Sequence, residues 1–177
     1  MSRQAIFNMT AIFLFSQILV ILGCDNPISV YENPQYKFKI KYPKIWQIIE
    51  NTDGIAVTFL SPKENSLDVY RENFSIVVQK MPRSSGHLPQ YTQEAIHQIS
   101  NTIQNMQIVR NETDILSENA AYRFEYITKE VNFYLRIIRI WTIIDDKAYD
   151  LTFSCDVDHC SDYLGIADTM FTSFQVE

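Results

Sequence analysis

The alternating segment YKFKIKY, at residues 36–42, is the pattern that most limits the fold of this chain. It places an aromatic or aliphatic side chain at every second position and a lysine between each pair. Successive side chains of a strand point to opposite faces, so the segment predicts a strand with one buried face, ended by Pro43. Further strands are predicted at 45–49, 55–60 and 74–79, with the turn-rich sequence NTDG between the first two.

A helix is predicted at residues 90–106, after the polar segment 61–73 and a loop bounded by prolines. Apolar residues recur there at steps of three and four, which gives a helix one apolar face. These residues are Ala95, Ile96, Ile99, Ile103 and Met106. Thr92 is the expected N-cap, because a threonine hydroxyl can accept a hydrogen bond from the first turn.

The C-terminal half predicts four more strands and a second helix. The strands are expected at 108–115, 121–128, 132–144 and 148–154, and the helix at 161–173. Asp145-Asp146-Lys147 is short enough to join the last two strands as a hairpin. In the longest strand Arg139 interrupts a face that is otherwise apolar. Strands in meander order with helices packed on them predict an α+β domain with an antiparallel β-sheet flanked by helices, not a parallel βαβ fold.

Length and charge limit the functional class. The 177 residues allow one ordinary domain, and 46% hydrophobic residues are enough to bury a core. The net charge of −6, with basic residues mostly scattered, argues against nucleic acid as a partner.

Residues 1–24 predict an export signal. Arg3 precedes an apolar stretch that closes with Ile21-Leu22-Gly23-Cys24, an ending that resembles the bacterial lipobox, in which a small residue precedes a lipid-modified cysteine. We therefore expect a lipoprotein signal peptide at 1–23, lipid attachment at Cys24, a tether at 24–35 and a domain at 36–177. An uncleaved transmembrane anchor and a cleaved secretory peptide without lipid are the alternatives. All three place the domain outside the cytoplasm.

The sequence contains no motif of a known catalytic class. G-x-S-x-G, H-E-x-x-H, P-loop and Rossmann glycine patterns are absent, and His87, His97 and His159 share no motif. We expect no enzyme and no catalytic residues.

Cys155 and Cys160 bracket the junction between the last predicted strand and the last predicted helix. In an oxidising compartment they are candidates for a disulfide, and two unpaired thiols are the alternative. A metal site that adds His159 and Asp156 or Asp158 has usable ligand types, but its spacing matches no common zinc pattern. Asp156, Asp158 and Asp162 also suggest calcium, yet helix capping explains them more simply. We expect no metal site.

Several segments, in order, resemble the PsbP family, especially its cyanobacterial lipoprotein members. The segments are YKFKIKYPKIWQI, VTFLSPKEN, ENFSIVVQKMP, LPQYTQEAIHQI, AAYRFEY, IIRIWTIIDDKAYDLTFS and MFTSFQV, which together span residues 36–176. The resemblance implies an α/β/α sandwich and an extrinsic, non-enzymatic protein of the thylakoid lumen or another extracytoplasmic face. It leaves calcium or another divalent ion open as a ligand.

The resemblance also implies a function for the anchored domain. Plant members help photosystem II to retain calcium and chloride, whereas cyanobacterial lipoprotein members are more similar to assembly factors. Only 11 residues separate Cys24 from Tyr36, so the long N-terminal extension of plant members is absent. We therefore expect a lipid-anchored protein, on the periplasmic or thylakoid-lumen face, that docks on or assists assembly of a membrane protein complex such as photosystem II. A ligand- or metal-sensing lipoprotein with a pocket between sheet and helix is the alternative.

Overall fold

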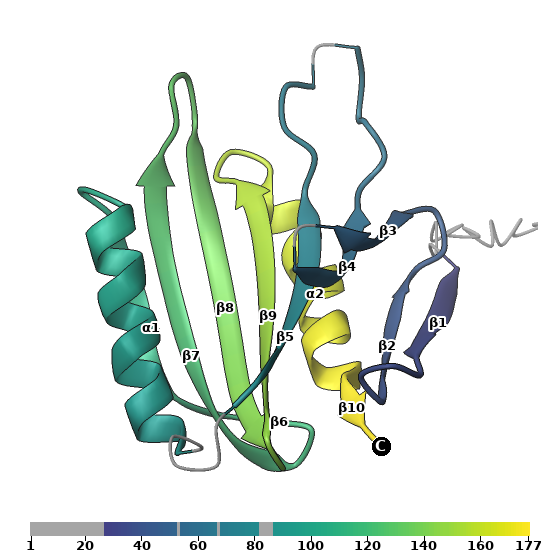
Figure 1. The fold of residues 1–177 in the computed structure, drawn as a ribbon. Helices are drawn as coiled ribbons and strands as arrows, with labels where there is room; N and C mark the ends of the chain where they lie inside the picture. Colours follow the sequence, from purple (N-terminus) through teal and green to yellow (C-terminus); the bar gives the residue numbers. More distant parts are fainter. Residues whose placement is uncertain (1–26, 53, 67, 82–86) are drawn as a thin grey trace, which may run out of the picture.

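The computed structural model describes residues 27–52, 54–66, 68–81 and 87–177, which form ten strands and two helices (Figure 1). In chain order the elements are β1 (Ile28–Asn33), β2 (Phe38–Pro43), β3 (Gln47–Thr52), β4 (Ile55–Leu60), β5 (Asn73–Lys80), α1 (Leu88–Thr102), β6 (Gln107–Leu116), β7 (Asn119–Lys129), β8 (Tyr134–Ile144), β9 (Lys147–Asp156), α2 (Cys160–Ser173) and β10 (Gln175–Val176).

The strands make two sheets, and every pairing between neighbours is antiparallel. The larger sheet has the order β3-β4-β5-β9-β8-β7-β6, and the smaller has the order β1-β2-β10. The predicted α+β class is therefore confirmed. The predicted hairpin between β8 and β9 is confirmed too, with Ile144 paired to Lys147 and Asp145 at a φ of 56°. Strand β4 has the predicted bounds, and the other predicted elements differ by a few residues at their ends.

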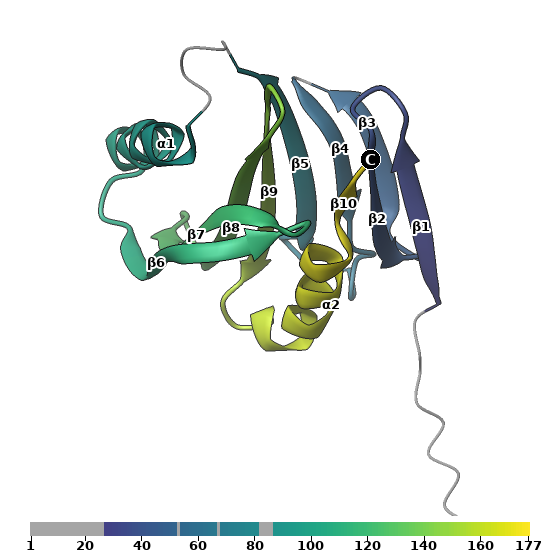
Figure 2. The ribbon, with the colours of Figure 1, turned by 90° about the horizontal axis from the view of Figure 1, so that it is seen from below.

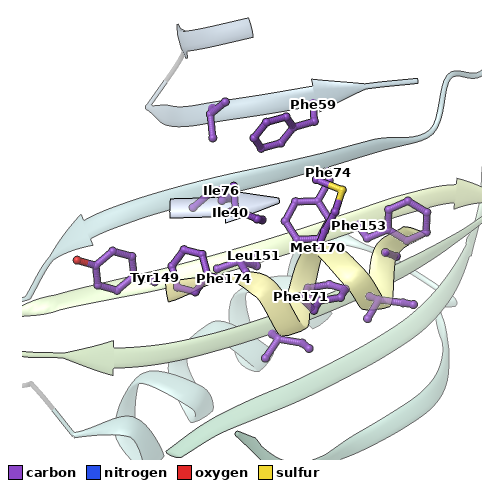
Figure 3. Close-up of a cluster of buried hydrophobic side chains, with 14 of the residues drawn as sticks. Ile40, Phe59, Phe74, Ile76, Tyr149, Leu151, Phe153, Met170, Phe171 and Phe174 are labelled. Atoms are coloured by element: carbon purple, nitrogen blue, oxygen red, sulfur yellow. The ribbon is translucent and has the colours of Figure 1, made fainter. Parts of the chain in front are cut away.

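The two helices lie on opposite faces of the seven-stranded sheet, which makes the α/β/α arrangement (Figure 2). Helix α2 packs on the face that also meets the small sheet. The main core lies between the larger sheet, α2 and the small sheet, and its largest fully buried side chains include Phe59, Phe74, Tyr149, Phe153 and Phe174 (Figure 3). Phe38 on β2 is fully buried there too. Four of the five expected apolar residues of α2, Leu164, Ala167, Met170 and Phe171, pack into this core, as does Phe174 directly after the helix.

Helix α1 packs on the other face, over β7 and β8. A smaller group, which we call the α1 core, consists there of the buried side chains of Ile99, Phe124, Tyr126 and Trp141. The predicted apolar face of the helix contacts this group. The predicted N-cap is wrong. The helix begins at Leu88 after the N-cap His87, and Thr92 is buried within it, where its Oγ1 accepts a hydrogen bond of 2.8 Å from Trp141 Nε1.

The expected tether at 24–35 is wrong for half of its length, because residues 28–33 form strand β1. This strand pairs with β2 along its whole length, from Ile28 opposite Pro43 to Asn33 opposite Phe38. Tyr31 on β1 is buried in the main core, and its hydroxyl donates to Glu50 Oε1 on β3 at 2.5 Å. The folded domain therefore begins well before Tyr36, close in sequence to Cys24.

Within the described residues, neither helix has the length and apolar character needed to span a bilayer. Cys24 and the predicted signal peptide lie outside these residues.

Candidate functional site

A partly buried ion pair lies on the α1 side of the sheet, at the point where Arg139 interrupts the apolar face of β8. Arg139 Nη2 donates to Asp150 Oδ2 on the neighbouring strand β9, and Arg139 Nε lies 3.4 Å from Asp150 Oδ1. The two residues are diagonal neighbours, since Trp141 is the direct partner of Asp150. The side chains are 25% and 6% exposed. Burial by itself lowers the pKa of Arg139, but the charge and hydrogen bonds of Asp150 outweigh it, and the net shift is upward.

The ion pair forms part of the wall of a groove of about 540 Å³ between α1 and the sheet. Helix α1 covers β7 and β8 but leaves β5 and β9 open beside it (Figure 2). Residues that line the open side include Val77 and Gln79 from β5, and Glu94 and Gln98 from α1. The groove thus combines a partly desolvated charge pair with amide and apolar surface, a mixture typical of binding sites.

The groove has the groups to bind a molecule, and they include the carboxylate of Glu94 in addition to the ion pair. Its lining contains neither a histidine nor a cysteine. Tyr91 is the lining phenol, and burial, reinforced by the charge of Asp150, raises its pKa to about 12. The phenol is therefore protonated at physiological pH. In this form it can donate a hydrogen bond but cannot act as a base.

A second, smaller hollow of about 240 Å³ lies where the β4–β5 connection meets the start of α2. The carboxylates of Asp68 and Glu64 in its lining already accept hydrogen bonds from other groups of the protein. Asp68 accepts hydrogen bonds from the backbone N–H groups of Glu64 and Tyr70, and Glu64 accepts one of 2.9 Å from the Tyr163 hydroxyl. His159 Nδ1 lies 3.8 Å from Glu64 Oε2.

Cys155 and Cys160 lie next to this hollow and form a disulfide, with their Cα atoms 5.1 Å apart. The bridge joins the end of β9 to the first residue of α2, and both residues are buried in the main core. Asp156 Oδ1 accepts a hydrogen bond from the Asp158 backbone N–H, which makes a local turn before α2. The expected helix capping by these aspartates is not seen, because the N-cap of α2 is His159 and no side chain caps the helix. In the described part of the chain no group of three or more His, Cys, Asp or Glu side chains is arranged to hold a metal ion.

A third hollow, of about 680 Å³, lies between the β6–β7 turn and β10. The Lys39–Glu177 ion pair is at its edge, with 3.4 Å between Lys39 Nζ and Glu177 Oε1. Its lining has no histidine or cysteine, and its charged residues are Lys39, Glu118 and Glu177.

The structure does not bring the three histidines together. His87 precedes α1, His97 is exposed on that helix, and His159 precedes α2 on the opposite face of the sheet. Sequence reasoning noticed Arg139 but missed its partner. Asp150 could have been found from the hairpin register, because it is the one acidic residue in the interior of the predicted strand 148–154.

The arrangement defines an α+β domain with a groove between α1 and the larger sheet. The chain belongs to the PsbP family, since the family model matches residues 27–176. The fold is similar to that of cyanobacterial PsbP (CyanoP) from Synechocystis sp. PCC 6803. The TM-score is 0.65 at 16% identity, with 86% of this chain and 94% of that chain covered.

Two other solved structures share the fold. LpqN, which is involved in cell envelope biogenesis of Mycobacterium tuberculosis, has a TM-score of 0.63 at 9% identity, with 85% of this chain and 90% of LpqN covered. The Ran-binding protein Mog1p of Saccharomyces cerevisiae has a TM-score of 0.59 at 9% identity, with coverage of 85% and 95%. No curated protein sequence matches the chain. At these identities the structural likenesses establish the fold alone, which matches the expectation from the sequence.

Proposed function

We propose that the protein is a non-catalytic, lipid-anchored extracytoplasmic protein that docks on a membrane protein complex or assists its assembly. The observation that carries the proposal is the distance in sequence between the anchor and the family domain. The PsbP family match begins at residue 27, three residues after the lipobox cysteine, Cys24. An acyl group at Cys24 would hold the domain at the membrane surface, where partners for an extrinsic domain are membrane proteins. Photosystem II is the complex that the family favours.

The disulfide supports an extracytoplasmic location. Disulfides persist in oxidising compartments and are rare in the reducing cytosol. The bridge between Cys155 and Cys160 lies inside the main core, so it contributes to the folded structure.

The groove offers the groups of a binding site, which are the Arg139–Asp150 pair, the Glu94 carboxylate, amides and a protonated phenol.

Affinity purification from detergent-solubilised membranes tests the docking proposal. Tagged wild-type protein at native abundance should recover a membrane protein complex in stoichiometric amount. An unrelated acylated lipoprotein with the same tag is the control for non-specific capture. Recovery of the protein alone would contradict docking.

Substitution of the acyl acceptor tests the anchor separately. Cys24→Ala should abolish acylation and leave an unprocessed precursor. Intact-mass analysis of the wild type should show loss of residues 1–23 and an added acyl mass. Retention of those residues without acyl mass would establish a transmembrane anchor instead.

A second candidate function is recognition of a small molecule or ion in the groove, and the partly buried Arg139–Asp150 pair favours it. A ligand at 100 times its Kd stabilises a protein by about 2.7 kcal/mol. Gln98→Trp should fill the groove and remove such a thermal shift. Gln93→Trp is the matched control, because Gln93 is exposed on the same helix and does not line the groove. If divalent ions and a metabolite panel produce no shift in the wild type, this second function is excluded for those compounds.

A further inference from the structure

The outer face of the β1–β2 hairpin combines exposed aliphatic side chains with lysines. Ile28 and Val30 on β1 are 49% and 55% exposed. Cross-strand partners share a face of a sheet, and the register pairs Val30 with Lys41 and Glu32 with Lys39. Tyr31 and Ile40 point the other way, into the main core. We call the surface formed by Ile28, Val30, Glu32, Lys39 and Lys41 the hairpin face, in which Glu32 is the acidic member.

The hairpin face lies in the most basic part of an acidic protein. Four lysines fall within residues 37–44, although the chain has a net charge of −6. Lys39 pairs with Glu177, with 3.4 Å between Nζ and Oε1. In the described part of the chain Lys37, Lys41 and Lys44 take part in no ion pair. Their positive charge is therefore available to an anionic surface.

The hairpin face also lies next to the proposed lipid anchor. Ile28 is four residues after Cys24, and an extended chain spans about 3.5 Å per residue. The N-terminal end of β1 is therefore within roughly 14 Å of an acyl-bearing cysteine. The interfacial region of a bilayer is several ångströms deep. A connection of this length therefore keeps β1 close to the headgroups.

We propose that the hairpin face lies flat on the bilayer, with Ile28 and Val30 at the boundary of headgroups and acyl chains and the lysines on anionic headgroups. This step rests on the proposed acylation of Cys24. Exposed aliphatic side chains beside basic ones are the usual composition of surfaces that bind a membrane interface. Helix α1 lies on the opposite side of the molecule from β1 in both views (Figures 1 and 2). The groove beside α1 is consequently turned away from the lipid and open to a partner.

Depth-dependent quenching of the full-length acylated protein tests this orientation. Val30→Cys carries a thiol-reactive fluorophore, and the protein is reconstituted into phosphatidylcholine vesicles that contain phosphatidylglycerol and a spin-labelled quencher lipid. Val131→Cys, in the β7–β8 turn and 88% exposed, is the matched control. We expect quenching at position 30 and little at position 131. Equal quenching at the two positions would overturn the proposal.

The lysines are tested with Lys41→Gln/Lys44→Gln in the Val30→Cys background. Each lysine near an anionic surface contributes several-fold to binding, so loss of two should shift the equilibrium away from the membrane-apposed orientation on the order of tenfold. Quenching should then fall in phosphatidylglycerol vesicles. Lys63→Gln/Lys129→Gln makes the same charge change elsewhere and should leave quenching unchanged. If both pairs behave alike, the electrostatic contact is wrong.

Intact-mass analysis of the same samples separates this proposal from the anchor on which it rests. Acylated protein without selective quenching at position 30 would refute the orientation and leave the anchor intact. Protein without acyl mass would remove both.

Discussion

Helices α1 and α2 pack on opposite faces of one sheet, and the cores beneath them differ in size and in chemistry. In the described residues the main core beneath α2 contains 22 buried hydrophobic residues, and the α1 core contains four. Helix α2 is enclosed by two sheets and joined to β9 by a disulfide. Helix α1 meets one sheet only, and beside it lie a groove and a partly buried ion pair.

This difference indicates which side of the molecule provides stability and which can adapt to a partner. Elements with few buried apolar contacts open at a lower free-energy cost than the rest of a domain. Helix α1 buries only Thr92 and Ile99. Binding in the groove can therefore shift α1 without disturbing the main core.

The largest expected effect is in the main core. Phe74→Ala removes a ring that is 0% exposed and lies 4.8 Å, centroid to centroid, from Phe171 on α2. Because the surrounding side chains cannot fully collapse into the cavity, the free energy of unfolding should fall by about 4 kcal/mol. Ile99→Ala, in the α1 core, should cost about 2 kcal/mol. Urea unfolding measures both, and equal losses would show that the two cores are not energetically distinct.

The next effect concerns the ion pair in the groove wall. Arg139→Met leaves Asp150 buried and charged without its partner, so the free energy of unfolding should fall by about 3 kcal/mol. The double change Arg139→Met/Asp150→Leu should recover most of this loss, because it removes both charges together. A double variant as unstable as Arg139→Met would show that packing, rather than the unpaired carboxylate, causes the loss.

Much of the fold follows from local periodicity. The alternation at 36–42 and the steps of three and four in both helices predicted the correct faces, because side-chain direction follows directly from backbone period. Strand β1 was missed because prolines flank it at 27 and 34 and because its apolar side chains fall on both faces, with Ile28 and Val30 exposed and Tyr31 buried, so no alternation is visible. Strand β10 has two residues, too few to show a period.

Tertiary contacts decided the features that the sequence could not predict. Thr92 has the chemistry of an N-cap, but its hydroxyl accepts a hydrogen bond from Trp141, 49 residues away in sequence. The sequence showed Arg139 as a charged residue on an apolar face. Its place in the groove wall could not be predicted, because it depends on the ion pair with Asp150 and on the space that α1 leaves open. A groove between elements is set by how a helix is placed on a sheet, and periodicity carries no information on that placement.

The disulfide should have a smaller effect, confined to the side of α2. Cys155→Ser/Cys160→Ser opens a loop of only a few residues, so the expected cost is about 1–2 kcal/mol, or a fall in Tm of a few degrees. Thiol labelling without reductant, on protein from its native membrane, should leave both cysteines unlabelled. Two freely labelled cysteines would mean that no bridge forms in the cell. Hydrogen exchange in α1 should be the same in this variant and in the wild type.

The smallest effect concerns Glu72, a buried carboxyl at the start of β5 on the α2 side. The residue is 1% exposed, and its side chain accepts a hydrogen bond of 3.3 Å from Ser61 Oγ. Burial raises its pKa above the ordinary 4.5, and hydrogen bonds from Ser61 and from backbone N–H groups only partly oppose this shift. The folded state therefore holds this proton to a higher pH than the unfolded chain does. The free energy of unfolding should fall as the pH rises from about 4.5 through the raised pKa.

Glu72→Gln isolates this effect, because glutamine keeps a hydrogen-bond acceptor and does not ionise. The variant should have a higher Tm than the wild type at pH 7, and the difference should vanish near pH 4, where the wild-type carboxyl is protonated in both states. Glu112→Gln, with its side chain 57% exposed, is the control and should shift Tm little at either pH. If Glu72→Gln lowers Tm at pH 7, then the hydrogen bonds to the carboxylate outweigh its burial. The charge at position 72 would then stabilise the α2 side, unlike the Arg139–Asp150 pair beside α1, whose joint removal should cost little.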